Sequence, residues 1–302
     1  MIVAVTLDPA VHVSYDTQQI VPGTTHPVGR VRYRAGGRGP AVARMLHTFG
    51  HEVVAAGLAG GTAGELIRAE LARRGVPTQF TPIAAESRRV VEVTDLSTGT
   101  TTSFAEPSPY ITTEELGRLA ADYRDLLDAA SAVVLSGGLA GGLPPETYGT
   151  FATYAAEAGV PVVLDAGGEA LRHGAGRRPT LVIPEPAPAA GTPVIESAAD
   201  PRDNGPARLM AAGAGAVATM AGHTVTVLTG QGEWRARLPG SAAMSRDALV
   251  AGFVPGIALG WSWPDMLQHA LSLAACAGPG GAVDLVSYER LLPQVIIETV
   301  VG

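Results

Sequence analysis

Residues 240–253 read GSAAMSRDALVAGF, a loop of small residues followed by a strongly apolar segment. Beyond Asp247 the apolar residues are mostly three and four positions apart, which predicts a buried helix. The first turn of a helix has free N–H groups and the positive end of the helix dipole, so it can hold an anion. Asp247 at this point can accept a proton from an alcohol while those N–H groups hold a phosphoryl group. The alternative is that Asp247 is only the N-cap of the helix, because Asp is a preferred capping residue.

The composition is that of a chain with enough apolar material for one large domain. Of its 302 residues, 46% are hydrophobic and only 16% are charged. The net charge of −7 argues against a general binder of nucleic acids or membrane surfaces. All 21 residues counted as Lys or Arg are Arg, so no Lys is available to hold a phosphate or to form a Schiff base.

Targeting signals are not visible in the chain, and we expect a cytoplasmic protein. Cys276 is the single cysteine, which excludes an intramolecular disulfide and a cysteine zinc cluster. The first residues, MIVAVTL, read as a strand and lack the basic start and the length of a signal peptide. Gly, Pro or polar residues interrupt every apolar run before it reaches about 18 positions, so we expect no transmembrane helix.

Short apolar strands alternate with helices from about residue 53 to residue 292. This alternation predicts an α/β fold, a single domain over residues 1–302 with a mostly parallel central sheet. Two regions, residues 10–34 and 79–107, interrupt the alternation with strand patterns that lack helix partners. We expect these two regions to pair into a small β-sheet that covers one edge of the main domain as a lid.

Six short motifs together resemble those of a known enzyme family. They are TLDPA (6–10), AGGRGPAVAR (35–44), GGTAG (60–64), SGGL (136–139), DAGGEAL (165–171) and AMSRDALVAGF (243–253). Their order and spacing resemble the PfkB (ribokinase-like) sugar kinases, specifically the 1-phosphofructokinase and tagatose-6-phosphate kinase branch. The resemblance covers nearly the whole chain. It implies a Rossmann-like three-layer (αβα) domain with a small β-sheet lid.

The resemblance also implies an activity, the magnesium-dependent transfer of the ATP γ-phosphate to a sugar hydroxyl. The family's catalytic base aligns with Asp247, and backbone N–H groups of the loop before it, at Ser245 and Arg246, would form the anion hole. Arg88 aligns with the residue that holds the phosphate already on the sugar, a task that suits the planar fork of Arg. The alternative for Arg88 is an exposed charge of the lid.

The glycine-rich motif at residues 35–44 is the other implied part of the acceptor site. Gly36 and Gly37 would let the backbone approach the sugar closely, although an ordinary turn is the alternative. Arg38 stands where the family has Lys and keeps the charge but not the shape. His12 replaces the family's sugar-binding Asp, and Ala41 replaces its Asn.

The nucleotide side of the implied site departs further from the family pattern. The expected nucleotide contacts are Thr219, Ala221, Gly222 and Glu185, in segments that have lost most of the family's motif residues. Met244 and Arg246 replace the two glycines of the anion hole, where a β-carbon can crowd a bound phosphate. No protein residue is assigned as a metal ligand.

Two main hypotheses follow. In the first, the chain is a working kinase with ATP and Mg²⁺, in which Arg246 brings its guanidinium to the phosphoryl group and Glu185 helps to hold Mg²⁺. His12 then reshapes the pocket for a phosphorylated sugar or cyclitol. In the second, the chain is an inactive pseudokinase that binds a ligand or a partner, and Asp247 is only an N-cap.

A third hypothesis and the expected partners complete the predictions. A nicotinamide-dependent oxidoreductase using the glycines of residues 57–64 is disfavoured by their spacing and by the lack of an acidic residue at the expected distance. The resemblance implies a homodimer formed through the lid strands. We expect no nucleic acid and no membrane among the partners.

Overall fold

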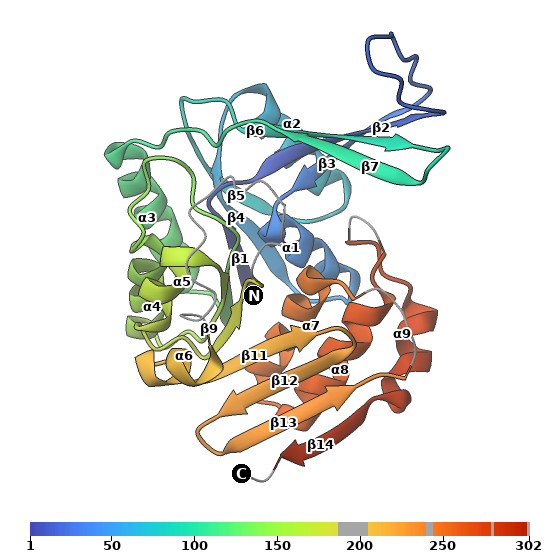
Figure 1. The fold of residues 1–302 in the computed structure, drawn as a ribbon. Coiled ribbons are helices and arrows are strands. Elements are labelled where there is room, and N and C mark those ends of the chain that lie inside the picture. The colour runs from blue at the N-terminus through green and yellow to red at the C-terminus, as the bar shows by residue number, and fades with distance from the viewer. Residues whose placement is uncertain (187–204, 240–243, 279–280, 301–302) are drawn as a thin grey trace.

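The computed structural model describes residues 1–186, 205–239, 244–278 and 281–300. Its centre is a ten-stranded sheet, which is parallel from β5 through β11 and continues with three antiparallel strands (Figure 1). In sheet order the strands are β5 (Thr78–Pro82), β4 (Val53–Ala59), β1 (Ile2–Thr6), β8 (Ala132–Ser136), β9 (Val162–Ala166), β10 (Leu181–Pro184), β11 (Ala216–Ala221), β12 (Thr224–Thr229), β13 (Gly232–Arg237) and β14 (Ile296–Val300). The predicted α/β fold with a mostly parallel sheet is confirmed. The terminal strand β14 was not predicted.

Helices cover both faces of this sheet, which gives the predicted three layers. Alternate residues of β1 belong to two separate hydrophobic cores, Ile2 and Ala4 to one, and Val3 and Val5 to the other. The first core includes residues of α1 (Arg38–Thr48), α2 (Gly61–Arg73), α7 (Arg246–Leu259), α8 (Trp263–Cys276) and α9 (Leu285–Leu291). The second includes residues of α3 (Thr113–Leu127), α4 (Thr147–Glu157), α5 (Gly168–Ala175) and α6 (Pro206–Ala212).

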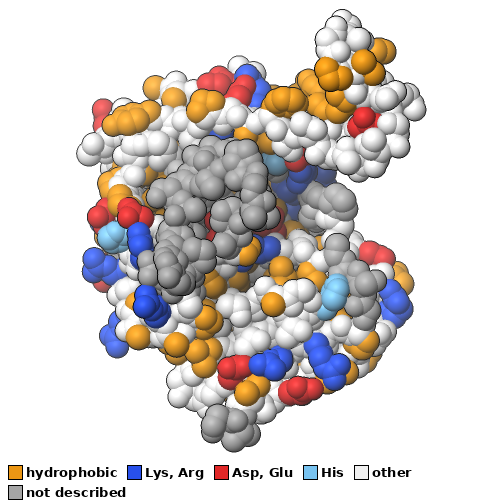
Figure 2. All heavy atoms as spheres, viewed as in Figure 1, with side chains coloured by type: hydrophobic (Ala, Val, Ile, Leu, Met, Phe, Trp, Pro, Cys, Tyr) orange, Lys and Arg blue, Asp and Glu red, His pale blue; other side chains and the backbone are white. Residues whose placement is uncertain are grey.

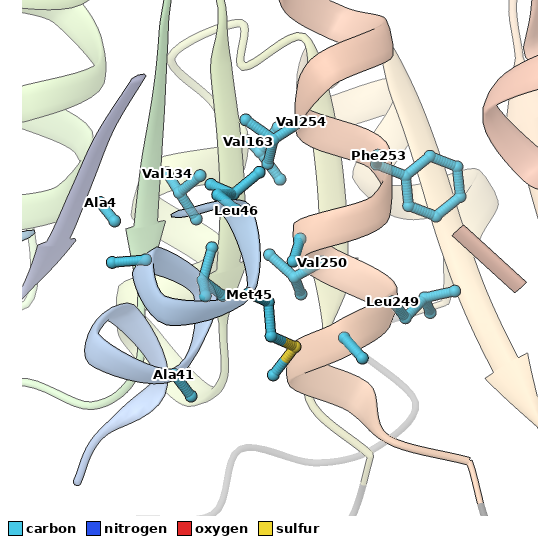
Figure 3. Close-up of a cluster of buried hydrophobic side chains, with 14 of the residues drawn as sticks. Ala4, Ala41, Met45, Leu46, Val134, Val163, Leu249, Val250, Phe253 and Val254 are labelled. Carbon is cyan, nitrogen blue, oxygen red and sulfur yellow. The ribbon is translucent and has the colours of Figure 1, made fainter. Parts of the chain in front are cut away.

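Helix α7 is buried on nearly all sides, as its apolar sequence predicts. Every residue from 248 to 256 is buried, and the helix packs against α1 and α8. Figure 3 shows Met45 and Leu46 of α1 close to Val250 of α7, above strands β8 and β9. A β-carbon at Gly252 would lie 2.4 Å from the Cα atom of Ala270, so glycine permits this close approach of α7 to α8. This packing holds the first turn of α7 in place.

A separate four-stranded sheet stands above one end of the large sheet (Figure 1). Its order is β3 (Val31–Gly36), β2 (Ala10–Thr17), β6 (Arg88–Asp95) and β7 (Thr100–Ala105). Strands β2 and β6 are parallel, and the two outer pairs are antiparallel. Both regions predicted to form a lid contribute to this sheet. The start of the second region does not, because β5 follows helix α2 as a crossover strand and pairs with β4 in the large sheet.

Within the described part of the chain, no helix has the length and apolarity needed to cross a membrane.

Candidate active site

The candidate site lies where the parallel strands end. Asp8 follows β1, Asp165 lies at the end of β9 and Glu185 follows β10. Ligand sites of α/β folds form at this edge because helices begin there and loops leave the sheet. Helices α1 and α7 begin here as well, with Arg38 and Arg246 as their first residues. Figure 2 shows the surface hollowed below the four-stranded sheet, with basic and acidic side chains inside the hollow.

The N-cap of helix α7 is Ser245 and not Asp247. The Ser245 hydroxyl accepts a hydrogen bond from the Ala248 N–H at 3.3 Å, and the Ser245 N–H donates to the Ala274 carbonyl at 2.9 Å. The alternative in which Asp247 is the N-cap is therefore wrong, because Ser245, two positions earlier, already accepts from a free N–H group of the first turn. Asp247 lies in the first turn as the second helical residue. Its carboxylate is free of the capping task, which favours a role toward a ligand. The loop residues 240–243 before Met244 are outside the described residues.

The surroundings of Asp247 raise its pKa to about 6 from the usual value of 3.8. Burial is the main cause, and the nearby negative charge of Asp165 acts in the same direction. The positive charges of Arg38, Arg246 and Arg44 partly offset both effects. At neutral pH a carboxyl with this pKa is mostly ionised yet more basic than an ordinary Asp, which suits a general base.

Arg246 does not extend into the open hollow, and its guanidinium instead lies against the ends of β9 and β10. Its Nε and Nη2 atoms donate to Oδ1 of Asp165 at 3.0 and 2.5 Å. Nη2 also donates to the Ile183 carbonyl at 2.6 Å, and Nη1 donates to the Pro184 carbonyl at 2.9 Å. Four of its N–H contacts are thus made to the protein itself. This arrangement fixes the side chain rather than leaving it free to follow a transferring phosphoryl group.

Arg38 completes a group of charged side chains around the buried Asp165. Its Nη1 atom donates to Oδ1 of Asp165 at 3.2 Å, and its Nη2 atom donates to Oε1 of Glu185. The second oxygen of Asp165 accepts from the Ser136 hydroxyl at 2.7 Å, and the Asp165 side chain has no exposed surface. The structure thus brings together three residues that the sequence singled out, Arg38, Glu185 and Arg246. Asp165 is the common partner of Arg38 and Arg246, and Glu185 joins the group through Arg38. From the sequence, Asp165 was recognised only as part of a motif.

The donor set of this group does not fit a protein-held magnesium ion. Mg²⁺ requires free carboxylate or other oxygen ligands in a near-octahedral arrangement. Both oxygens of Asp165 already accept hydrogen bonds, and Glu185 is paired with Arg38. Among the residues that the structure describes, no group of three or more His, Cys, Asp or Glu side chains is arranged to hold a metal ion. The expectation that Glu185 helps to hold Mg²⁺ has no support in this arrangement.

His12 lies on the four-stranded sheet beside Gly36. Its Nδ1 atom is 3.0 Å from Oε1 of Glu92, and the Nη2 atom of Arg34 is 3.3 Å from the same nitrogen. Burial, and then the positive charge of Arg34, lower the pKa of His12, so the imidazole is neutral at pH 7. A β-carbon at Gly36 would be 1.9 Å from Cδ2 of His12. Glycine is required at position 36 because the imidazole occupies the space of a side chain.

Gly37 and Arg88 are the other two residues expected at the acceptor site. Gly37 precedes helix α1 with a φ of +99°, a conformation that favours glycine. Arg88 is held by Asp8, whose Oδ2 atom is 2.8 Å from the Arg88 Nε atom and accepts from the Ser108 hydroxyl at 2.7 Å. Oδ1 of Asp8 is buried without a hydrogen-bond partner among the described residues. Burial raises the pKa of Asp8 against the opposing effect of Arg88.

Asp8 is a site residue that sequence reasoning missed, although a signal was present. TLDPA places an acidic residue just after the first strand, at the edge of the sheet where ligand sites form. The consequence is an ion pair that offsets the charge of Arg88, the residue expected to hold a phosphate. Glu92 was missed as well, because nothing in its local sequence points to His12 eighty positions earlier.

Three of the four expected nucleotide contacts, all except Glu185, lie together at one hairpin. Thr219 and Ala221 belong to the end of β11, and Gly222, with a φ of +57°, turns the chain into β12. Strand β11 is parallel to β10, so this turn is at the same edge of the sheet as Glu185. Among the described residues, no hydrogen bond or ion pair joins Thr219, Ala221 or Gly222 to Asp247 or to the charged residues around Asp165.

Comparison with known proteins assigns the family. The model of the pfkB family of carbohydrate kinases matches residues 3–231. The chain belongs to this family. The matched span covers strands β1 to β12 and ends before Asp247, so it does not test the assignment of the base. Membership sets aside the nicotinamide-dependent oxidoreductase.

Solved structures of phosphofructokinases share the fold over the whole length of the pfkB-family chain. A protein from Thermotoga maritima, provisionally described as a 1-phosphofructokinase, has a TM-score of 0.84 at 22% identity, with 99% of both chains covered. A protein from Staphylococcus aureus, provisionally described as a phosphofructokinase, has a TM-score of 0.82 at 22% identity, with both chains fully covered. Phosphofructokinase-2 from Escherichia coli, in a tetrameric inhibited form, has a TM-score of 0.83 at 21% identity, with coverage of 97% and 98%. At these identities the likeness establishes the ribokinase-like fold.

Proposed function

We propose that this chain transfers the γ-phosphate of ATP to a hydroxyl of a phosphorylated sugar or sugar-like (cyclitol) acceptor, with Asp247 as the general base. The observation that carries the proposal is the position of Asp247, in the first turn of α7 but relieved of capping by Ser245. Its raised pKa of about 6 supports the same role. The structural neighbours agree with the acceptor class, since E. coli phosphofructokinase-2 has been solved with fructose-6-phosphate.

In the proposed reaction, Asp247 accepts the proton of the acceptor hydroxyl as its oxygen attacks the γ-phosphorus. The bond to the β–γ bridging oxygen breaks, and ADP leaves with that oxygen. The Ser245 N–H, expected in the anion hole, already donates to the Ala274 carbonyl. The N–H groups proposed to face the developing negative charge are therefore those of Arg246 and Asp247, in the first turn of α7. Magnesium, where it takes part, supplies charge neutralisation as a companion of the nucleotide phosphates.

The acceptor is proposed to bind against the four-stranded sheet. The neutral imidazole of His12 can form a hydrogen bond with a sugar hydroxyl, and Gly36 leaves room for the imidazole. Arg88 is the proposed ligand of the acceptor phosphate. Because Asp8 already binds Arg88, the phosphate has to compete with a buried carboxylate for this guanidinium.

The direct test is ADP release by the purified protein with ATP, Mg²⁺ and a panel of hexose phosphates, pentose phosphates and inositol phosphates. We expect turnover with at least one acceptor, and a fall of about 10²- to 10⁴-fold in Asp247→Asn. Asp265→Asn is the matched control. Asp265 also lies in the first turn of a Ser-capped helix, α8, but outside the site.

Three outcomes decide between the alternatives. Turnover that is lost in Asp247→Asn and kept in Asp265→Asn supports the proposal. Turnover that survives in Asp247→Asn removes Asp247 as the base. If calorimetry finds neither ATP nor ADP binding and no acceptor supports turnover, the inactive pseudokinase that acts by binding a ligand or a partner becomes the better account.

We also propose that the protein is a homodimer through the outer face of the four-stranded sheet. Large apolar side chains are exposed on this sheet and its connections, including Tyr33 at 51% and Phe104 at 63%. Large apolar side chains exposed on one small sheet are typical of association surfaces. Light scattering of the wild type should give twice the chain mass, and Phe104→Asp should give the mass of one chain; a wild-type monomer at micromolar concentration would contradict the proposal.

A further inference from the structure

The guanidinium of Arg246 is surrounded by oxygen atoms of a kind that usually binds metal ions. Its acceptors are one carboxylate oxygen of Asp165 and the carbonyl oxygens of Ile183 and Pro184, at 2.5 to 3.0 Å. Carboxylate and backbone carbonyl oxygens are the ligands of hard cations such as Mg²⁺ and Ca²⁺. In this protein the positive charge among these oxygens is the guanidinium of Arg246 and not a metal ion.

The burial of Asp165 makes a cation at this position necessary. Its side chain has no exposed surface, and a buried carboxylate without a positive partner is strongly destabilising. Arg38 supplies one charge, but it is shared with Glu185. The second charge comes from Arg246, which contacts Asp165 through two nitrogens.

The local structure explains why Arg can do this. Arg246 is the first residue of α7, directly after the Ser245 cap, so its backbone is fixed at a set distance from the strand ends. The planar fork of guanidinium reaches a carboxylate and two carbonyl groups at once, which a Lys ammonium cannot match in geometry.

We propose that Arg246 is a tethered cation, a side chain that occupies an oxygen-lined cation site of the protein and keeps divalent metal ions off Asp165. Arg246 is then a positioning residue that fixes the strand ends beside Asp247, and the protein itself holds no magnesium there. This inference rests on the proposed kinase function only for its consequence, that magnesium reaches the reaction with the nucleotide. The cation site itself is independent of turnover.

The test is a titration with Mn²⁺ alone, followed by electron paramagnetic resonance, in which bound Mn²⁺ loses the signal of the free ion. We expect no tight Mn²⁺ site in the wild type. Arg246→Ala and Arg246→Gln, which remove the charge, should gain one Mn²⁺ site at least about tenfold tighter than any in the wild type. Adding Asp165→Asn to either variant should abolish the gain.

Arg118→Ala is the matched control, because it breaks an exposed pair with Glu114 at 2.9 Å and should create no site. A wild type that itself binds one Mn²⁺ ion tightly, with the binding lost in Asp165→Asn, would overturn the proposal, and the wild-type titration alone shows whether a tight site exists even if an Arg246 variant fails to fold. Folded Arg246 variants without Mn²⁺ binding, or with binding that survives Asp165→Asn, would overturn it as well. Since no nucleotide or acceptor is present, these outcomes are separate from a failure of the ADP-release assay.

Discussion

Two groups of Arg and carboxylate side chains lie at the candidate site, and their central carboxylates, Asp165 and Glu92, differ in burial. The group around Asp165 is formed by the ends of buried parallel strands and the starts of two helices. The second group lies on the four-stranded sheet around Glu92, where His12, Arg34 and Glu92 are each about a quarter exposed. The same residue types therefore serve as a fixed internal charge in one place and as exchangeable partners in the other.

This difference follows from solvent. Charges around the buried Asp165 interact strongly, and removing one partner lowers the stability of the protein by several kcal/mol. Water screens the charges around Glu92 and can replace a missing partner there. The buried group is suited to holding Asp247 in a defined field. The sheet group is suited to exchanging a protein partner for water or a ligand.

The sharpest test of the comparison is Asp165→Asn, which keeps the shape but removes the shared charge. Two guanidinium groups then lose their common partner in a buried place. We expect the free energy of unfolding to fall by about 3–5 kcal/mol, measured by urea denaturation. A loss no larger than that of an exposed ion pair would remove the distinction between the two groups.

The pH dependence of the activity tests how burial and the neighbouring charges shift the pKa of Asp247. Its pKa of about 6 means that the base is protonated below this pH and ionised above it. We expect kcat/KM to fall about tenfold for each pH unit below 6 and to level off above 7. An acid limb near 4, the value of an unperturbed Asp, would contradict the assignment.

The same raised pKa predicts a stability change in Asp247→Asn. The folded protein favours the protonated carboxyl, so this contribution to stability is present below about pH 4 and is lost as the pH rises through 6. At pH 8 the Asn variant should be more stable than the wild type by about 1–2 kcal/mol, and the difference should vanish at pH 4. Thermal melts at both pH values measure this, and equal stability at pH 8 would contradict it.

On the sheet side, Asp8→Asn should release Arg88 from its ion pair. We expect KM for a phosphorylated acceptor to fall about tenfold with little change in kcat, since the guanidinium no longer has to leave a carboxylate. Steady-state kinetics provide the measurement. An increase in KM would mean that Asp8 itself binds the acceptor, through the buried Oδ1 atom that lacks a partner.

The smallest expected effect is that of Glu92→Gln, the counterpart of Asp165→Asn. The Glu92 side chain is 26% exposed, and its contacts with His12 and Arg34 are reached by water. We expect a loss of less than about 1 kcal/mol in urea denaturation. A loss of stability as large as that of Asp165→Asn would contradict the comparison, because it would mean that water does not screen the charges around Glu92.

Much of the fold was predictable because local patterns carried it. The alternation of apolar strands and helices indicated the parallel sheet, and the polar alternation at residues 10–34 located strands of the small sheet. Strand β5 was misassigned because its sequence does not reveal its partner. The crossover through α2, and not its own pattern, places it beside β4.

The candidate site was predictable only in part. Arg38, Glu185 and Arg246 were selected as separate residues of separate motifs. The contacts of Arg38 and Arg246 with Asp165, and of Glu185 with Arg38, lie beyond any local signal. The cap of α7 was misread because Ser245 and Asp247 are both good capping residues, and the choice depends on backbone geometry at the helix start.

The sequence by itself determined the family, the layered α/β fold and the residue types that line the site, because motif order and hydrophobic periodicity are properties of the chain. Only the tertiary structure decided the partner of each charge. It turned Arg246 toward the strand ends, paired Asp8 with Arg88 and left Asp247 free in the first turn of α7. The physical reason is that a buried charge takes its partner from whichever residues the folded sheet brings within hydrogen-bond distance, and sequence separation places no limit on that choice.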